Sequence, residues 1–372
     1  MKVLYVCDQL AHWGGVERIF VDKTKRLVSM FGCDVYILTT DQGDHPLSFQ
    51  LHPAVHYTDL GVRYHLQYRY RGLRRYWEKW QRYRLLQQRF VEKMAKIQPD
   101  VIVSTTSFLT PLLNKIRRRI PLVVESHCGY EATIDEGSGR WWKRIALWYQ
   151  LRELSKTDVL VTLTEHDAAK WRHVHPCVKV IPNVVHMNES NTYSTLDEKR
   201  IIFVGRFALQ KAIPDLLAVW RLVHERHPDW RLDMYGEGEL KKALTIEVAA
   251  MNANIYVHEP VADILSKYRE SSLLVLSSLY EPFGLVIPEA MSCGLPVVSF
   301  EGDGPNSIIT DGKDGFLIKN RDIGDFADRV CQLIENQELR QRLGQAAIQS
   351  AQRYSAENIM PMWKELFESL KK

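Results

Sequence analysis

The chain has 372 residues, more than one hydrophobic core usually supports, so we expect two domains of roughly 150 to 200 residues each. Its content of 45% hydrophobic and 25% charged residues is typical of a folded, water-soluble protein. No apolar run approaches the roughly 20 residues that a membrane-spanning helix needs, so we expect no such segment. Asp8 interrupts the first apolar run too early for a signal peptide, and the expected location is therefore the cytoplasm.

The net charge of +4 is distributed unevenly along the chain. Before residue 190 there are 28 Lys and Arg against 19 Asp and Glu, a balance of +9. The remainder has 21 against 26, a balance of −5. Because such an asymmetry concerns partners rather than fold, we expect an anionic partner for the first half.

Short apolar runs rich in β-branched residues alternate with longer helical patterns in the first half of the chain. The predicted strands are 2–7, 34–40, 100–106, 120–126, 158–164 and 178–183. This alternation predicts βαβ units that share a parallel sheet.

A polar, turn-rich stretch at 187–199 is typical of a linker, and the alternation restarts after it. The strands predicted there are 200–206, 230–236, 253–259, 272–278, 295–300 and 315–320. We therefore expect an α/β protein with two doubly wound parallel-sheet domains, residues 1–186 and 187–353, facing a central cleft. Residues 354–372 are predicted to form an amphipathic helix that can pack on either domain.

A glycine pair, Gly14 and Gly15, follows the first predicted strand and precedes a predicted helix. Glycine lets the backbone approach a phosphate group, and the N–H groups at a helix start would face that phosphate. The pattern is not G-x-G-x-x-G, and for the glycine pair alone a simple tight turn is the favoured interpretation.

The second half opens with a strand followed by Gly205, Arg206 and, five residues later, Lys211. A guanidinium can form two hydrogen bonds with phosphate oxygens and an ammonium adds a compact charge, a combination that suits a diphosphate. Two solvated surface cations are the alternative.

The stretch YEPFGLVIPEAMSCGLPVV, residues 280–298, is mostly apolar but contains Glu281 and Glu289. Pro288 fits only the first turn of a helix and Gly294 can end one, so the helix must start between Gly284 and Pro288. Both carboxylates would then lie near a strand end, where they could accept hydrogen bonds from the hydroxyl pairs of a sugar or ribose. Alternatively, Glu289 merely complements the helix dipole and Glu281 is a loop charge.

These motifs together resemble the retaining GT-B glycosyltransferases of family 4. The resemblance rests on E-x7-E from Glu281 to Glu289, on VGR-x4-K from 204 to 211, and on GGVER at 14–18. It covers nearly the whole chain and implies the GT-B fold of two Rossmann-like domains. The glycine that commonly follows the family's Lys is Ala212 here, which concerns only local loop geometry.

The resemblance also implies a role for individual residues. Glu281 would contact the hydroxyls of the donor sugar, and Glu289 would hold the nucleotide ribose. The base would lie near the region from Tyr256 to Val261. Side chains and backbone N–H groups would bind the donor on the diphosphate side, and the residues concerned are Gly15, Arg206, Lys211, Phe283, Gly284, Leu285 and Val286. His127 stands where the family often places a histidine near the reacting sugar, so His127 and Glu281 are the catalytic candidates.

No metal or cofactor is expected. The sequence contains no Asp-x-Asp, the pair with which other glycosyltransferases hold a divalent metal, and its six cysteines lack ligand spacing. Fixed cations and helix N-termini would then stabilise the leaving group. No well-placed nucleophile is evident, so retention would proceed by attack on the same face within an ion-pair-like transition state.

Residues 63–89 contain nine Arg or Lys against the single Glu78, with Tyr and Trp between them. Such a segment suits an anionic membrane surface, and RWWKR at 140–144 repeats its chemistry. The main alternative is a solvated helix whose aromatic residues pack on its own sheet. Phosphate contact and stacking could also serve nucleic acid, but nothing else in the sequence supports that partner, and we expect none.

The expected function is transfer of a hexose or N-acetylhexosamine from a nucleotide-diphosphate sugar, with a UDP-sugar favoured, to a saccharide acceptor. The acceptor is expected to be lipid-linked and the product a surface polysaccharide such as capsule or lipopolysaccharide. This places the enzyme in the cytoplasm, with peripheral association at the inner face of the cytoplasmic membrane. A nucleotide-sugar 2-epimerase of GT-B fold and a non-catalytic sugar-nucleotide-binding subunit remain as alternatives.

Overall fold

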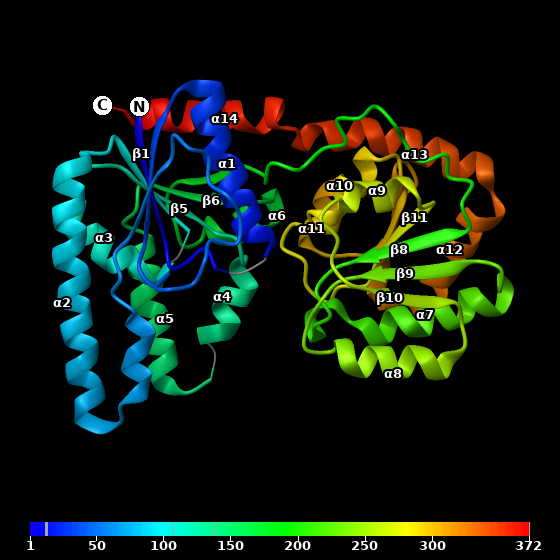
Figure 1. Cartoon of the computed structure of the whole chain (residues 1–372), viewed down its shortest axis with the longest axis horizontal. Helices are drawn as coiled ribbons and strands as arrows, with labels where there is room; N and C mark the ends of the chain where they lie inside the picture. The colour runs from blue at the N-terminus through cyan, green and yellow to red at the C-terminus, as the bar shows by residue number, and fades with distance from the viewer. Residues whose placement is uncertain (12–13, 106, 138, 372) are drawn as a thin grey trace. The chain divides into compact units, whose positions relative to one another are not determined.

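A computed structural model describes residues 1–11, 14–105, 107–137 and 139–371 of the chain. The chain forms two compact units, one of Met1–Val184 with Ile359–Lys372 and one of Val185–Asn358. Each unit contains a single parallel sheet, as the alternation of strands and helices predicted (Figure 1). No helix of the described residues is long and apolar enough to cross a membrane.

The first unit has a seven-stranded sheet in the order β3-β2-β1-β4-β5-β6-β7. Its strands are β1 (Lys2–Cys7), β2 (Asp34–Thr39), β3 (His56–Asp59), β4 (Val101–Ser104), β5 (Leu122–Glu125), β6 (Val159–Thr162) and β7 (Val178–Val180). Its helices are α1 (Gly15–Phe31), α2 (Gly72–Ile97), α3 (Thr110–Ile116), α4 (Tyr130–Gly137), α5 (Trp141–Leu154) and α6 (Glu165–Trp171). Only β3 was missing from the prediction, because this edge strand is half-exposed and lacks an apolar run.

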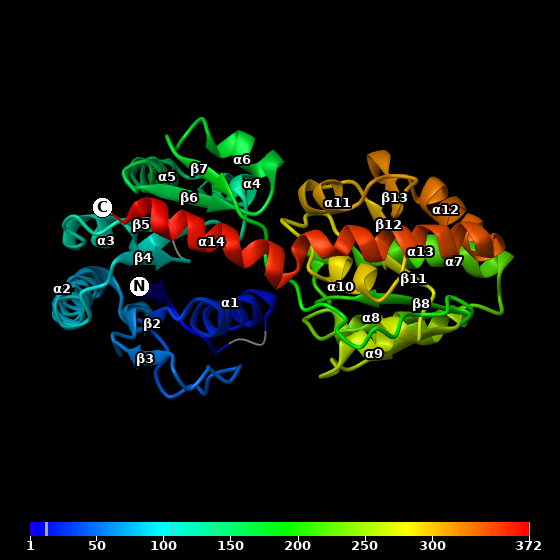
Figure 2. The ribbon, with the colours of Figure 1, turned by 90° about the horizontal axis from the view of Figure 1, so that it is seen from above.

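The two faces of the first sheet are covered by different helices (Figure 2). Leu4, Ile102 and Val124 point to the face that packs against α2, α3 and α5. Alternate residues such as Tyr5 point to the other face, where the ring of Tyr5 meets Phe20 of α1 at 5.1 Å between centroids. Strands buried on both faces must be apolar throughout, which explains the continuous apolar runs.

Helix α2 is amphipathic only in its second half. The side chains that it buries, Leu86, Phe90, Met94 and Ile97, recur at helical spacing near its end. Its first three turns hold the exposed aromatic residues Tyr76, Trp77 and Trp80. The start of the helix therefore extends beyond the part that packs on the sheet.

The second unit has a six-stranded sheet in the order β10-β9-β8-β11-β12-β13. Its strands are β8 (Arg200–Val204), β9 (Arg231–Tyr235), β10 (Ile255–His258), β11 (Leu273–Leu276), β12 (Val297–Phe300) and β13 (Gly315–Ile318). Its helices are α7 (Ile213–Arg226), α8 (Lys241–Met251), α9 (Ile264–Arg269), α10 (Val286–Ser292), α11 (Asp303–Ile308), α12 (Ile323–Glu335) and α13 (Gln337–Ala351). All six strands were predicted, and the α10 start at Val286 falls within the predicted interval.

The last helix, α14 (Ala356–Leu370), belongs from Ile359 onward to the first unit. Its residue Trp363 packs against the ammonium of Lys23, which lies 4.4 Å from the ring centroid. Lys364 lies over Phe31 at 5.5 Å, so α14 contacts α1 at both positions. The apolar residues of α14 that recur at helical spacing, including Met360 and Phe367, are buried.

Candidate functional site

The loops that follow β8 and β11 carry most of the predicted residues of the second unit. These two strands are parallel neighbours, with Ile201 opposite Leu273. Their carboxyl ends therefore lie at the same edge of the sheet, the edge where ligands bind in open α/β folds. Gly205, Arg206 and Lys211 follow β8, while Glu281 and α10 follow β11.

Lys211 and Glu281, predicted separately, form an ion pair between Nζ and Oε2. The Ser278 hydroxyl donates to the same Oε2 at 3.2 Å. Both charged side chains are largely buried, with 14% and 13% of their surface exposed. The carboxylate of Glu281 thus has a fixed position, and Oε1 is its second acceptor atom.

Backbone contacts hold these two loops together. The N–H of Leu279 donates to the Gln210 carbonyl at 2.8 Å, and the Gln210 side chain returns a bond to the Tyr280 carbonyl at 2.8 Å. The Ser277 hydroxyl donates to the carbonyl of Lys211 at 2.7 Å. The relative position of Lys211 and Glu281 is therefore determined by several independent bonds.

Arg321, the last residue of the 3₁₀ helix Lys319–Arg321 that follows β13, supports the same loop and was not predicted. Its guanidinium donates to the carbonyls of Ser277 and Ser278 at 2.9 and 3.0 Å and pairs with Asp215 of α7. It also lies over the ring of Phe300 at 4.3 Å. A lone cation at a strand end has no sequence signal that distinguishes such a contact from a solvated charge.

Ala212 has a left-handed backbone, with φ 44° and ψ 50°. This conformation is strained for residues other than glycine, which explains why the related family commonly has glycine at this position. Ala212 adopts this backbone here, and the loop brings Lys211 to Glu281.

The segment before α10 passes very close to α11. Gly284 has φ +86°, which glycine adopts without strain, and the Gly304 N–H donates to the Glu281 carbonyl at 2.9 Å. Phe283 is buried and its ring meets Tyr354 at 5.4 Å, while Leu285 and Val286 are half-buried at the start of α10. Glu289 is buried in the first turn of α10.

The other predicted donor residues follow β8 and β10 in the second unit and start α1 in the first. Arg206 is exposed immediately after β8, and Val261 is 37% exposed in the loop after β10. In the first unit, Gly15 is exposed at the start of α1. His12 and Trp13 of the preceding loop lie outside the described residues.

His127, the other catalytic candidate, follows β5 in the first unit and forms a buried cluster with Glu125 and Lys23. Its Nε2 lies 3.2 Å from Oε2 of Glu125, the last residue of β5. The Lys23 Nζ of α1 donates to Oε1 of Glu125 at 2.5 Å and also contacts Oε2. Nδ1 of His127 is buried and has no hydrogen-bond partner among the described residues.

The electrostatics of this cluster follow from its burial. Burial alone would raise the pKa of Glu125, but Lys23 and His127 outweigh that effect and lower the pKa to about 2. Burial lowers the pKa of Lys23, and Glu125 opposes this shift only in part. Burial and the nearby Glu125 charge also raise the pKa of Tyr5 well above its ordinary value. Glu125 is therefore a carboxylate throughout the neutral range.

Lys23 and Glu125 were missed by the prediction, although the sequence carries a signal for both. Lys23 lies four residues after Ile19 and four before Leu27, both buried, and so occupies the apolar stripe of α1. Glu125 ends an otherwise apolar strand. A cation on a core-facing helix position requires an acidic partner, and an acid at a strand end can supply it.

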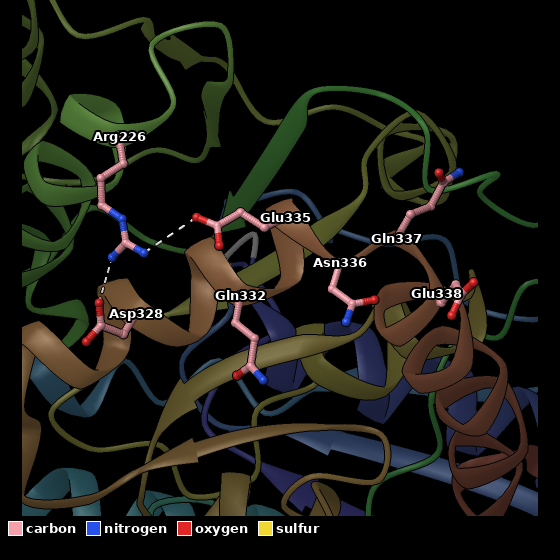
Figure 3. A pocket seen from close by; sticks show the side chains of 7 residues that line it. All are labelled: Arg226, Asp328, Gln332, Glu335, Asn336, Gln337 and Glu338. Atoms are coloured by element: carbon pink, nitrogen blue, oxygen red, sulfur yellow. Dashed lines mark hydrogen bonds and ion pairs between the residues drawn. The ribbon is translucent and has the colours of Figure 1, made fainter.

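One hollow in the second unit does not coincide with these residues (Figure 3). It has a volume of about 630 Å³ and lies at the end of α7 and the junction of α12 and α13. Arg226 there pairs with Asp328 at 2.6 Å and with Glu335 at 3.5 Å. Because α7 runs back from the carboxyl end of β8, its own end lies at the opposite edge of the sheet. Among the described residues, no cluster of His, Cys, Asp and Glu could hold a metal ion.

Two units that each contain one parallel α/β sheet are the architecture of the GT-B class, and comparisons with known proteins agree with it. Residues 13–189 match the family model Glycosyltransferase Family 4, and residues 188–350 match Glycosyl transferases group 1. The chain therefore belongs to the family 4 (group 1) glycosyltransferases.

Individual relatives are distant. The amylovoran biosynthesis glycosyltransferase AmsD of Erwinia amylovora is 29% identical over 224 residues, which cover 56% of this chain and 62% of that protein. The crystal structure of TarM matches with a TM-score of 0.78 at 16% identity, covering 98% of each chain. The structure of Anabaena HepE in complex with UDP matches with a TM-score of 0.76 at 16% identity, covering 99% of this chain and 100% of that one. The structural likenesses establish the fold.

We predict that Gly304→Ala destabilises the second unit. An added Cβ would lie 2.2 Å from the Phe283 carbonyl oxygen and 2.7 Å from that of Glu281, so the backbone must move. We expect a loss of about 1–3 kcal/mol in the free energy of unfolding, measured by urea denaturation. Gly302→Ala is the matched control, because its nearest contact would be an ordinary 3.6 Å to Pro305. Equal stability of both variants would show that this close approach is not required.

Proposed function

We propose that the protein is a retaining glycosyltransferase that moves a hexose or N-acetylhexosamine from a nucleotide-diphosphate sugar to a saccharide acceptor. The observation that carries this proposal is the Lys211–Glu281 pair at the carboxyl ends of β8 and β11, next to α10. A cation for phosphate and a carboxylate for hydroxyls are the two groups that a sugar nucleotide requires, and here they lie in contact.

Each donor residue has a proposed partner. Arg206 and Lys211 bind the diphosphate, together with backbone N–H groups near Gly15, Leu285 and Val286. Glu281 binds the sugar hydroxyls and Glu289 the ribose, while the base lies near Val261. Gly284 allows the chain to approach the phosphates, and buried Phe283 anchors that segment.

A UDP-sugar is the favoured donor, and a surface polysaccharide is the favoured product. The bound UDP in the related HepE structure supports the choice of nucleotide. AmsD, which acts in amylovoran biosynthesis, supports the choice of product. The acceptor is a saccharide, and we infer that it is linked to a lipid.

Catalysis does not require a metal in this proposal, because fixed cations stabilise the departing diphosphate. Arg206 is exposed and can reach a ligand, while Lys211 is already oriented by Glu281. We infer that retention proceeds by attack on the same face of the sugar, with His127 beside the reacting centre.

The basic segment 63–89 supports peripheral binding to the inner face of the cytoplasmic membrane. Its alternative, in which the aromatic rings pack on the sheet, is wrong for Tyr76, Trp77 and Trp80, which are exposed. Arginines lie over other rings of the segment, Tyr68 and Tyr70, and Arg84 lies 4.8 Å from the ring centroid of Trp80. Rings at the lipid interface with cations at anionic head groups are the arrangement of a membrane-binding surface.

Helix α5 extends this surface. Trp141, Trp142 and Trp148 are exposed, and the starts of α2 and α5 lie at the same end of the unit (Figure 1). Burial and the neighbouring Tyr149 of α5 raise the pKa of Tyr83 of α2, which places the two helices close together. Both helices thus carry exposed aromatic and basic side chains at the same end of the unit.

We expect the purified chain to release nucleoside diphosphate from a UDP-sugar only when a saccharide acceptor is added. A panel of UDP- and GDP-sugars, followed by product analysis of the anomeric configuration, measures this and identifies the donor. Isomerisation of the donor without acceptor would instead show an epimerase. Tight binding of nucleotide without any turnover would show a non-catalytic subunit.

We expect Glu281→Ala and Arg206→Ala to affect different steps. Loss of Glu281 removes the contact with the sugar and should lower kcat by about 100-fold. The affinity for UDP should be unchanged or higher, because Lys211 loses its internal partner. Loss of Arg206 should weaken UDP binding by about tenfold or more, measured by calorimetry.

Arg342→Ala, an exposed arginine on α13, is the control for general loss of charge. An equal loss of UDP affinity in Glu281→Ala would contradict the sugar role. Unchanged UDP affinity in Arg206→Ala would remove Arg206 from the diphosphate site.

We expect the chain to float with vesicles that contain phosphatidylglycerol and not with vesicles of phosphatidylcholine alone. Trp77→Ser/Trp80→Ser should weaken that binding by about tenfold, because each ring loses its burial in the interface. Ile246→Ser, which changes an exposed apolar residue of α8, should have no effect. Binding that is independent of the anionic lipid would contradict the membrane proposal.

A further inference from the structure

Lys23 is a buried cation that takes no part in the proposed donor site or in the proposed membrane surface. Its side chain is 3% exposed and that of Glu125 is 4% exposed. The ammonium lies 5.2 Å from the ring centroid of Tyr5 and 4.4 Å from that of Trp363. Residues from β1, α1, β5 and α14 therefore enclose one ion pair, and such enclosure strengthens its hydrogen bonds.

The pair constrains the atom that Glu125 presents to His127. A carboxylate has only acceptor atoms and an ammonium only donors. Lys23 contacts both oxygens of Glu125, and Oε2 also lies 3.2 Å from Nε2 of His127. The partner of Oε2 in His127 must be a donor, so Nε2 carries the hydrogen. In a neutral imidazole the other nitrogen then has a lone pair.

The pair also limits the charge around His127. Glu125 alone would place an isolated buried negative charge 3.2 Å from the imidazole. Lys23 balances that charge within hydrogen-bond distance, so the pair as a whole is neutral. His127 therefore faces a neutral ion pair rather than an isolated carboxylate.

We propose that Lys23 and Glu125 are positioning residues that hold His127 as the Nε2–H tautomer, so that Nδ1 accepts a hydrogen bond from a hydroxyl of the bound sugar. Nδ1 is buried without a partner among the described residues, on a side chain that is 9% exposed. A lone pair suits a hydroxyl donor and not a phosphate oxygen, which is itself an acceptor. The assignment of the hydroxyl to a sugar rests on the proposed transferase function, whereas the tautomer does not.

The tautomer can be measured without substrate. Histidine labelled with ¹⁵N, observed by NMR at about pH 8 where an ordinary imidazole is neutral, distinguishes the two nitrogens. His127→Gln identifies the signals of His127 by their disappearance. We expect a protonated Nε2 and an unprotonated Nδ1. A hydrogen on Nδ1, in either the other tautomer or the cation, would overturn the proposal.

The near-isosteric Glu125→Gln should reverse the tautomer. Lys23 can accept no hydrogen, so it retains the amide oxygen and turns the amide NH₂ toward His127. Nε2 must then accept and Nδ1 must carry the hydrogen. We expect inverted NMR signals and a fall in kcat of about tenfold, with UDP affinity unchanged. Glu92→Gln, which alters an exposed Glu–Lys pair in the same unit, is the control.

The outcomes separate this inference from the proposed function. Inverted signals with unchanged kcat would show that the tautomer is irrelevant to transfer and would overturn the positioning role. If no transfer is found with any donor, the proposed function fails, and the tautomer of the natural chain still decides the role of Lys23 and Glu125. That measurement also decides it if Glu125→Gln does not fold.

Discussion

The ion pair between Lys211 and Glu281 joins the two loops at the carboxyl edge of the sheet in the second unit. It joins the loop after β8 to the loop after β11, and parallel pairing of these strands brings the two loops to the same edge. The remaining features of the edge depend on this junction. Arg321 holds the backbone behind Glu281, and Gly304 allows the segment before α10 to pass close to α11.

The two Lys–Glu pairs of this protein differ in a way that suits different tasks. Lys211 and Glu281 retain some exposure, and their remaining hydrogen-bonding capacity is available to a ligand. Lys23 and Glu125 are almost fully buried, and aromatic rings cover the ammonium. A fully enclosed pair cannot bind a ligand directly, because opening it would leave a charge without compensation. It can act only through a neighbour, and His127 is that neighbour.

The first three turns of α2 expose aromatic residues at the surface of the first unit. A helix that served only to cover the sheet would bury its aromatic residues, yet Trp77 and Trp80 face solvent while Phe90 is buried. Exposed tryptophans among arginines are costly in water unless a partner covers them. An anionic lipid surface would cover the rings and neutralise the cations together, as the proposed membrane binding requires.

A structural feature could be predicted from the sequence where its signal lies within a few neighbouring residues. Of the thirteen strands in the described part of the chain, twelve have apolar runs that identify them, and β3 lacks one because it is an edge strand with little burial. The interval in which α10 begins could be predicted because Pro288 restricts it. The pair between Lys23 and Glu125 spans 102 positions, and no local pattern connects such residues.

The sequence by itself determined the class of fold and the types of residue at the strand ends, because periodicity and the backbone preferences of Gly and Pro act within a few residues. The tertiary structure alone decided which of those residues meet. It brought Lys211 and Glu281 into contact, and it placed Lys23 against the ring of Trp363. Contacts of this kind depend on strand order and on helix packing, which arise only when distant segments bury their surfaces together.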